Sequence, residues 1–333
     1  MSKNNIPEGW KMTTLGEAAE VKHGFAFSGN NITDAENENI LLTPGNFLIG
    51  GGWKEGKKYF NGDIPNNYIL AADDLIITMT DLSKEGDTLG YPALIPYNPT
   101  KKFLHNQRIG IVIINENFAI KKYIYFLMRF SGYQRFIVNT ASGSTVKHTS
   151  PSKIKSYNFA MPPLLEQQAI AAVLSSLDDK IELLREQNKT LEAIAAAIFK
   201  RWFIDFEFPD KNGNPYKSSG GKMIESELGE IPKGWKIGFL GDNIISSLLK
   251  TGVDNFEREK IYLDTASIQA LNIIDLKNKI TFQERPLRAN MQPVINSVWF
   301  AKMKNSKKAL FFDTYSEWEL NNFILSTSKT HFG

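Results

Sequence analysis

A repeated motif sets the strongest limit on how this chain can fold. Residues 6–16 read IPEGWKMTTLG and residues 231–241 read IPKGWKIGFLG, so the second copy is offset from the first by 225 in the numbering (231 minus 6). An offset of this size is far above the roughly 20 to 50 residues of a solenoid unit, and it indicates a duplicated module. The sequence of 333 residues reaches the counterpart of residue 108 in the second copy (333 minus 225). We therefore expect one whole module and part of another.

Between the two copies lies a heptad pattern, which we call the seam. Its residues recur at alternating steps of four and three: Ile170, Leu174, Leu177, Ile181, Leu184, Asn188, Leu191, Ala195 and Ile198. Steps that average 3.5 residues keep one stripe of a helix facing a partner helix, which is the requirement of a coiled coil. At about 1.5 Å per residue, the seam would span about 42 Å. We predict a coiled-coil helix over residues 164–204, entered through a proline pair, and a turn-rich linker over residues 205–230.

Residues 1–163 are expected to form a mixed α/β module, and residues 231–333 a partial second copy of it. The apolar runs 75–79, 93–96 and 109–114 are bounded by Gly, Pro and Asn, which is typical of short strands. The stretches KKYIYFLMRF and YQRFIV have the periodicity of helices. The predicted fold class is thus α+β, with a long coiled-coil helix. Because the second copy lacks counterparts of residues 109–210, we expect Trp299, Phe300 and Phe311 to be incompletely covered.

Charge is distributed unevenly along the first module. Residues 1–97 hold seven Lys/Arg and thirteen Asp/Glu, whereas residues 98–160 hold ten Lys/Arg and one Glu, a net charge of +9 (ten minus one). Aromatic residues are interleaved with these bases, a composition typical of a surface that lies on phosphates. The alternative is a solvated face whose bases are balanced by acids from the first hundred residues. Charge alone leaves both interpretations open.

Several functional classes are disfavoured by composition. The absence of cysteine excludes disulfides, thiol nucleophiles and cysteine metal ligands, and four isolated histidines predict no metal site. No stretch approaches the roughly 18 consecutive apolar residues of a membrane helix, and the first residues show no leader pattern. We expect a soluble, cytoplasmic protein.

Three motifs that could indicate an enzyme are weak. Asn214-Pro215-Tyr216 is similar to the catalytic loop of amino-methyltransferases but lacks one of its two prolines. A nuclease could be assembled from Pro209-Asp210 and the acid-x-Lys triplet at residues 275–277, but such triplets are frequent by chance. The run SSGGK lacks the spacing of a phosphate-binding loop. We predict no catalytic residue and no cofactor on this chain.

Taken in order, the motifs resemble the specificity subunits of type I restriction-modification systems. The matching stretches are the IPEGW and IPKGW starts, LHNQRIGIV, SGSTVKHTSPSKI leading into NFAMPPLLEQQAIAAVLSSLDDKI, and the junction from WFIDFEFP to NGNPYKSSGGKMIESELGEIPKGW. The resemblance implies that each module is a target-recognition domain that reads one half of a split DNA sequence. It implies partner subunits, a methyltransferase and a motor nuclease for restriction, which use S-adenosylmethionine, ATP and Mg. The family's second long helix, the antiparallel partner of the first, has no counterpart here.

Two loops of the first module carry the residue types that read DNA. HNQR (residues 105–108) combines Asn, Gln and Arg, and SGSTVKHTS (residues 142–150) combines small hydroxyl residues with Lys and His. Arg reads guanine edges and Asn or Gln reads adenine edges. The predicted DNA-binding residues are Lys84, Lys101, Lys102, Asn106, Gln107, Arg108, Ser144, Thr145, Lys147 and His148.

Each of these assignments has a structural alternative. Asn106 and Gln107 could satisfy backbone groups, and Gly143 and Ser144 could form a helix terminus and its cap. Lys147 could be solvated, and Lys84 could lie in a surface turn. At the level of function, the alternative is a coiled-coil assembly protein or an inactive specificity cassette without independent DNA targeting. The seam is expected to pair with a second copy of the chain or with a separate chain that completes the second module.

Overall fold

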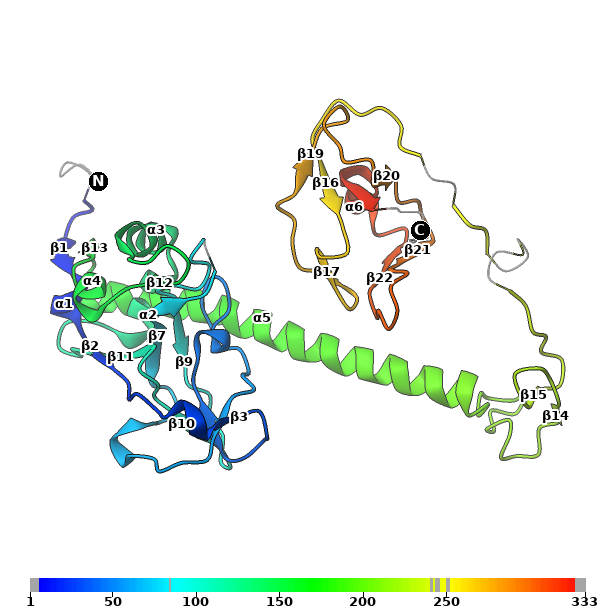
Figure 1. The fold of residues 1–333 in the computed structure, drawn as a ribbon, viewed down its shortest axis with the longest axis horizontal. Coiled ribbons are helices and arrows are strands. Elements are labelled where there is room, and N and C mark those ends of the chain that lie inside the picture. Colours follow the sequence, from blue (N-terminus) through cyan, green and yellow to red (C-terminus); the bar gives the residue numbers. More distant parts are fainter. Residues whose placement is uncertain (1–5, 84, 240–241, 243–245, 250–251, 327–333) are drawn as a thin grey trace. The chain divides into compact units, whose positions relative to one another are not determined.

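Strand β7 (Leu75–Thr78) runs through the middle of the first module, and all four of its side chains are buried. Leu75 and Ile77 belong to one core cluster and Ile76 to another, because successive side chains of a strand point to opposite faces. Figure 1 shows the computed structural model, which describes residues 6–83, 85–239, 242, 246–249 and 252–326.

The chain divides into two units, Met1–Ala195 and Ala196–Gly333. In chain order, the helices and strands up to the end of the long helix are β1 (Lys11–Thr14), α1 (Leu15–Ala18), β2 (Ala19–His23), η2 (Gly29–Asn31), β3 (Ile32–Thr33), β4 (Asn39–Leu41), η3 (Pro44–Asn46), β5 (Tyr59–Phe60), η4 (Asn66–Tyr68), β6 (Ile69–Leu70), β7, β8 (Thr80–Asp81), β9 (Pro92–Leu94), β10 (Lys102–Leu104), β11 (Ile109–Ile114), α2 (Lys121–Arg129), α3 (Ser131–Thr140), β12 (Lys147–His148), α4 (Pro151–Lys155), β13 (Asn158–Met161) and α5 (Leu164–Phe199).

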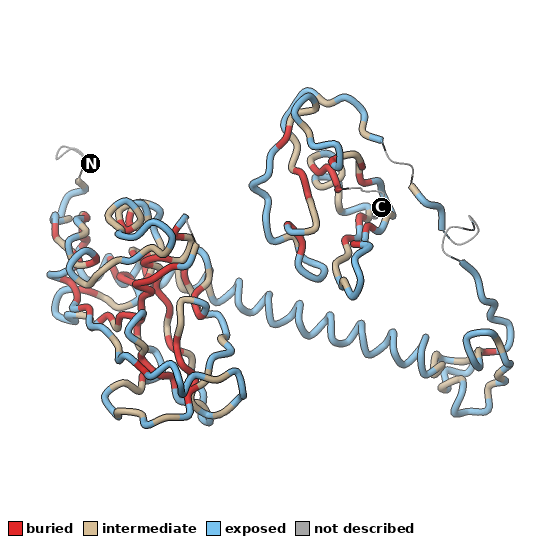
Figure 2. Tube along the Cα trace, viewed as in Figure 1, coloured by how far each residue is buried: buried red, intermediate tan, exposed pale blue. Residues whose placement is uncertain are grey.

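Two sheets and a set of helices form three layers in the first module. One sheet has the strand order β2-β11-β7-β9, and the other has the order β3-β5-β4-β10-β6. Ile76 and Ile109 of the first sheet pack with Ile40 and Phe103 of the second. Helices α2, α3 and α4 contribute buried side chains to the cluster on the opposite face of the first sheet. Figure 2 shows that the buried segments of the first module lie in these layers.

The predicted elements of this module are confirmed with small shifts of their ends. The strand expected over residues 109–114 is β11, and the one expected over residues 93–96 is β9, which ends two residues earlier because Pro96 follows. The two helical stretches are α2 and α3. The mixed α/β class of the module is therefore confirmed.

Strand β1 begins the module and pairs with β13, its last strand. The pairing is antiparallel, from Lys11 opposite Met161 to Thr14 opposite Asn158. Nearby, the indole Nε1 of Trp10, from the first copy of the repeated motif, donates to the Glu166 carboxylate at 3.1 Å. The first strand is thus fastened to the segment that enters α5.

Helix α5 begins directly after the proline pair, as predicted, and a π-helical turn, η5 (Lys200–Ile204), continues it. Gln167 anchors its first turn in the module. Its side chain donates to the carbonyl oxygens of Pro162 (2.9 Å) and Phe118 (3.2 Å) and accepts from the Ile120 amide (2.9 Å). A residue that is 1% exposed and whose side-chain groups are all paired in this way fixes the helix to the core.

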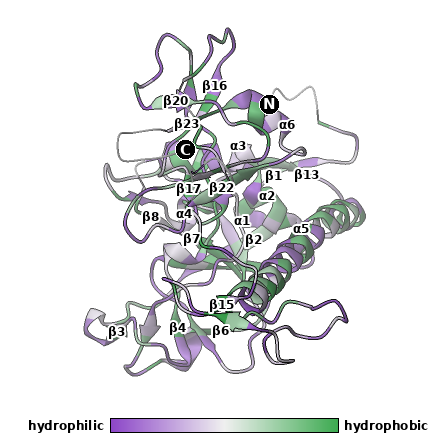
Figure 3. Ribbon diagram, turned by 90° about the vertical axis from the view of Figure 1, so that its right-hand side faces the viewer, coloured by the Kyte–Doolittle hydropathy of each residue, from purple (hydrophilic) through white to green (hydrophobic). Residues whose placement is uncertain are grey.

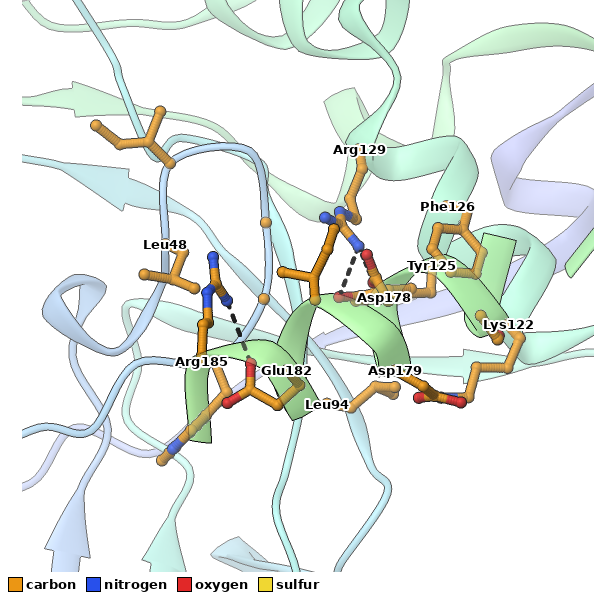
Figure 4. A pocket seen from close by; sticks show the side chains of 16 residues that line it. Leu48, Leu94, Lys122, Tyr125, Phe126, Arg129, Asp178, Asp179, Glu182 and Arg185 are labelled. Atoms are coloured by element: carbon orange, nitrogen blue, oxygen red, sulfur yellow. Dashed lines mark hydrogen bonds and ion pairs between the residues drawn. The ribbon is translucent and has the colours of Figure 1, made fainter. Parts of the chain in front are cut away.

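Arg129 makes a second connection between the module and α5 (Figure 4). Its guanidinium donates to the Gly50 carbonyl (Nε, 2.8 Å) and to the Tyr125 hydroxyl (3.2 Å), and it pairs with Asp178 of α5. Gly51, with φ of +87°, leaves room for this side chain, since a Cβ there would lie 2.7 Å from the Arg129 Cγ. One side chain thus joins a loop, α2 and α5.

Beyond these contacts the seam is uncovered. Ile170 packs against the core, but Leu177, Ile181, Leu184, Leu191 and Ile198 are 43–61% exposed. Figures 2 and 3 show the same stretch of α5 as exposed and as carrying many hydrophobic residues. An apolar stripe of this length on one helix has the form of a docking surface.

The segment after α5 is more ordered than the predicted linker. The ring of Phe208 stacks on Trp235 (centroids 5.5 Å apart) and on Tyr216 (4.7 Å). A carboxylate oxygen of Asp210 accepts from the amides of Asn212 and Asn214, which closes the turn between these rings. Trp235 belongs to the second copy of the repeated motif, so that motif packs against residues that follow the end of α5.

The second module repeats the sheet of the first. Its remaining elements, and those of the segment before it, are β14 (Met223–Ile224), β15 (Ile231–Pro232), β16 (Lys260–Leu263), β17 (Ile268–Gln269), β18 (Asn272–Ile273), β19 (Lys279–Ile280), β20 (Ala289–Met291), β21 (Ser297–Phe300), β22 (Ala309–Phe312), α6 (Glu317–Asn322) and β23 (Phe323–Ser326). The sheet order is β19-β16-β23-β20, with a parallel central pair and antiparallel neighbours. The first module has the same arrangement in β5-β4-β10-β6.

The expected exposure of the second module's large side chains is correct for two residues and wrong for one. Phe300 and Phe311 are exposed on the β21-β22 hairpin. Trp299 is instead 1% exposed, and its indole Nε1 donates to the Ser326 carbonyl at 3.2 Å. The correction has a simple cause: Trp299 points to the opposite face of the hairpin, where it completes a core with Phe312, Phe323 and Leu325.

Candidate nucleic-acid interface

The short segment Met79–Asp81 connects the two loops that the sequence singled out. The Met79 amide donates to the Arg108 carbonyl at 2.9 Å, and the Met79 carbonyl accepts from the Thr149 amide at 3.0 Å. Directly after Met79, β8 pairs antiparallel with β12, so that Thr80 lies opposite His148. Loops that are far apart in the sequence are thereby held side by side.

A cavity of about 520 Å³ opens between these segments, and we call it the central cavity. Its lining residues are His23, Gly24, Ala26, Met79, Thr80, Gln107, Arg108, His148 and Thr149. Three of the predicted DNA-binding residues, Gln107, Arg108 and His148, therefore share one site. Acidic side chains are absent from this lining in the part of the chain that the structure describes.

The HNQR loop is held by its first residue. His105 is buried, and its Nε2 lies 2.9 Å from the Ile109 carbonyl, which can only accept, so Nε2 carries the proton. Burial lowers the pKa of His105, which keeps the ring neutral near pH 7. The ring and the bond from the Gln107 amide to the Phe25 carbonyl (2.9 Å) set the shape of the loop.

The two amide side chains of this loop are available for a ligand. Within the described ranges, the side chains of Asn106 and Gln107 make no hydrogen bond, so nothing shows them satisfying backbone groups. Arg108 is exposed and its guanidinium has no ion-pair partner among the described residues. The loop thus presents two donor groups at the cavity, on Gln107 and Arg108.

Residues 142–148 form a hairpin rather than a flexible loop. Ser142 and His148 exchange backbone hydrogen bonds of 2.9 and 2.8 Å. Gly143 has φ of +92°, and a Cβ there would lie 2.0 Å from the Val146 carbonyl oxygen, so the turn requires glycine. The helix-terminus interpretation of Gly143 and Ser144 is wrong, because α3 ends at Thr140. Ser144 and Thr145 lie exposed at the hairpin tip, apart from the cavity lining.

Asp81 braces this site from inside. The residue is 4% exposed, and its carboxylate accepts from the Ser83 amide (2.7 Å) and from the amide and hydroxyl of Thr88. Burial alone would raise the pKa of the Asp81 carboxyl, but the hydrogen bonds from Ser83 and Thr88 outweigh burial and hold the pKa below its ordinary value. The negative charge of Asp81 is therefore stabilised by hydrogen-bond donors of the loop itself.

Half of the basic residues in the +9 segment are neutralised by acids. Of the ten, five form ion pairs: Lys101 with Glu36, Lys102 with Glu38, Lys121 with Asp73, Arg129 with Asp178 and Lys155 with Glu20. Lys101 and Lys102 do not line the central cavity. Lys84 lies outside the described residues. The balanced-surface alternative thus holds for one half of the segment, and Arg108 and Lys147 belong to the other half, which has no ion pair among the described residues.

Sequence reasoning missed His23, Thr80 and Thr149. Each lines the central cavity and each follows or precedes a recognisable element. His23 ends β2, and Thr80 lies just beyond the buried strand β7. Polar residues directly after an apolar strand are a usable signal, but only the fold shows that these strand ends meet.

The described ranges lack two further features that would indicate other functions. They contain no group of three or more His, Asp or Glu side chains that could hold a metal ion. They also contain no helix long and apolar enough to cross a membrane.

The first module thus combines two packed sheets, a cavity without acidic lining and a long, largely exposed helix. Residues 7–193 match the sequence profile of the family described as Type I restriction modification DNA specificity domain. The match covers more than half of the chain, and the chain belongs to this family.

Curated relatives agree with this placement. The Type I restriction enzyme MjaIX specificity subunit of Methanocaldococcus jannaschii is 34% identical over 161 residues, which are 48% of this chain and 35% of the relative. The HindI specificity subunit of Haemophilus influenzae is 31% identical over 185 residues, 50% of this chain and 39% of the relative. The matches thus span little more than a third of these relatives. Among solved structures, the S subunit of a Type-I restriction-modification system from M. genitalium is 16% identical, with a TM-score of 0.44 over 94% of this chain and 72% of that one.

Proposed function

We propose that this chain is a DNA-recognition subunit without chemistry of its own. One observation carries the proposal: the two loops predicted to read DNA meet at one cavity whose described lining has an arginine, a glutamine, two histidines and no acid. A surface of this kind suits contact with phosphates and with base edges together. Membership in a DNA specificity family supports the same conclusion.

The residues divide by chemistry into readers and positioning contacts. Gln107 can accept from and donate to an adenine edge, and Arg108 can donate twice to a guanine edge. Lys147, half-buried on β12, presents a point charge suited to a phosphate. Asn106, next to Gln107, is a third candidate reader.

The wider assignment follows the family. The chain would direct a methyltransferase subunit and a restriction subunit to a bipartite target, and S-adenosylmethionine, ATP and Mg would be bound by those partners. Such a role places it in the cytoplasm with the DNA. The uncovered seam of α5 is the surface that would join it to a second helix, from another copy of the chain or from a complementing chain.

A binding experiment against salt tests the proposal. The purified chain is titrated against a pool of random-sequence duplexes, and bound duplexes are sequenced to obtain the preferred site. Arg108→Ala should weaken binding to that site by about 1 to 3 kcal/mol and relax its sequence preference, whereas Lys147→Ala should weaken all duplexes alike and reduce the salt slope by about 1. Lys122→Ala removes an exposed cation away from the cavity and serves as the control. Equal binding by the Arg108 variant, the Lys147 variant and wild type would contradict the proposed interface.

A second candidate function is assembly through the coiled coil alone, favoured by the exposed seam. It predicts a flat response of duplex binding to salt, together with self-association or capture of a partner chain. Light scattering on wild type and on a Leu177→Glu and Leu184→Glu double variant measures that association. Asn188, which in an antiparallel pair centred on Leu184 would meet Lys180 and Ile181, should strengthen the pair when changed to Leu.

A further inference from the structure

The two histidines of the central cavity have different hydrogen-bond partners. His23 ends β2, and its Nδ1 lies 3.4 Å from the Gln107 carbonyl oxygen. A carbonyl oxygen only accepts, so Nδ1 carries a proton in both charge states of the ring. The neutral His23 ring then has a lone pair on Nε2, and only the protonated ring can donate from that nitrogen.

His148 has a partner that can adapt. Its Nδ1 lies 3.2 Å from the Thr80 hydroxyl, which can donate to a neutral ring or accept from a charged one. A Cβ on Gly143 would lie 3.6 Å from the ring Cδ2, so the hairpin turn lies close to the ring. Protonation of His148 therefore leaves its contact with Thr80 intact.

The basic groups around the two rings favour an anion. Arg108 faces the same cavity, and Lys22 precedes His23 on β2. His105 lies behind the loop, where burial lowers its pKa and keeps the ring uncharged. The positive charge near the cavity therefore comes from Arg108, from Lys22 and from either cavity histidine when it is protonated.

The acids of the neighbouring elements are engaged elsewhere. On β2, Glu20 pairs with Lys155 of α4, which packs on that strand. On β8, the Asp81 carboxylate faces Ser83 and Thr88. Before β7, the Asp74 carboxylate accepts from the Ala71 amide at 2.8 Å. Glu20 is thus neutralised by a cation, and the Asp81 and Asp74 carboxylates face donors of their own loops and do not line the cavity.

We propose that the central cavity binds a backbone phosphate of DNA together with protons taken up by His23 and His148. The protonated rings donate to the phosphate oxygens, and the charge of Arg108 beside them favours the anion. A neutral His23 would present its Nε2 lone pair to the anion, which repels it. Binding therefore raises the proton affinity of the rings, and by linkage DNA affinity rises as the pH falls from 8 to 6. The inference rests on the proposed function and adds the ligand group and its pH dependence.

The test measures the Kd of a fluorescent random-sequence duplex at pH 6, 7 and 8 and at constant ionic strength. Proton uptake on binding predicts a Kd that is several-fold lower at pH 6 than at pH 8. Calorimetry in two buffers of different ionisation enthalpy counts the protons taken up directly. We expect His23→Gln to remove part of the pH dependence and the His23→Gln and His148→Gln double variant to remove it, while Lys122→Gln retains it.

The outcomes separate the two claims. A double variant that still takes up protons and keeps the wild-type pH dependence would overturn the phosphate site and leave DNA recognition standing. A wild-type chain that binds no duplex at any pH would overturn the proposed function itself. Circular dichroism of each variant at each pH verifies that the fold is retained, and Arg108→Ala, which should weaken binding at all three pH values, reports on the same cavity without a titrating group.

Discussion

Each of the two modules contains a sheet of the same topology, but the elements around that sheet differ. In both, a parallel pair of strands lies at the centre, Asn39–Leu41 with Lys102–Leu104 in the first and Ile261–Leu263 with Phe323–Leu325 in the second. In both, a hairpin supplies further core. Within the residues described, only the first module adds a strand such as β11, the helices α2 to α4 and a closing strand such as β13.

The strands of the first module differ in how far away in the sequence their partners lie. The parallel pair of the sheet joins residues 63 apart in the first module (102 minus 39) and 62 apart in the second (323 minus 261), and the strand pairs are the same in both modules. The first strand of the first module pairs only with β13, at the far end of that module. In the second module, residues 236–239 of the repeated motif, the counterparts of Lys11–Thr14, form no strand. The repeated motif therefore leads into a strand only where a distant partner is present.

The largest effect is expected from the core of the second module. Trp299→Ala removes a buried ring and its hydrogen bond to Ser326, which should cost about 3 to 5 kcal/mol and unfold that module alone. Differential scanning calorimetry should show the loss of one transition, and limited proteolysis should then cut after residue 205 and spare the first module. Phe311→Ala, at an exposed position on the same hairpin, is the matched control. Loss of both transitions together would show that the two modules do not unfold independently.

A smaller effect is expected where the first module holds α5. Gln167→Ala leaves one buried and two partly buried backbone groups without their side-chain partner, at a cost of about 1 to 3 kcal/mol. Urea unfolding of the first module measures this loss, and Gln187→Ala, on the exposed part of the same helix, should leave stability within about 0.5 kcal/mol of wild type. Equal stability of both variants would show that the anchor lies elsewhere, at Arg129.

The smallest effect is expected from the pH dependence of stability. The lowered pKa of Asp81 means that its contribution to stability is present above the ordinary carboxyl pKa of about 4 and is lost as the pH falls through the lower pKa of the folded state. Asp81→Asn should therefore destabilise by about 1 kcal/mol near pH 7 and by less below pH 4. Hydrogen exchange of residues 78–90 reports the change. Asp81 is the third residue after β7, and the third residue after β21 in the second module is Met303. The hairpin of residues 297–312 should therefore show no such pH dependence, and an equal response there would contradict this account.

Much of this architecture is readable from the sequence, because its signals are local. The apolar runs at residues 75–79 and 109–114 predict two central strands, and the seven-residue repeat predicts α5. The duplicated motif predicts a second module, whose sheet repeats the first. The failure at Trp299 is instructive, since nothing local in the sequence indicates which face of a hairpin is covered.

The candidate site is predictable only in part. Residue type indicates Gln107, Arg108 and His148, but their meeting depends on the long-range pairing of β8 with β12. His23 and Thr80 come from other strand ends and carry no motif. Residue type alone also does not separate Arg108 from Lys101, because ion pairs with acids distant in the sequence decide which cations are neutralised.

The pairing of β1 with β13 also governs how the chain can fold during its synthesis. Lys11 lies opposite Met161, so the first strand leaves the ribosome long before its partner exists. At about 5 to 20 residues per second, synthesis of the chain between them takes roughly 8 to 30 seconds. Throughout that interval β1 has no strand to pair with. Strand β2 likewise remains unpaired until β11 has been made, because Val21 of β2 lies opposite Val112 of β11. The pairing that involves the first strand of the module is therefore the last to form.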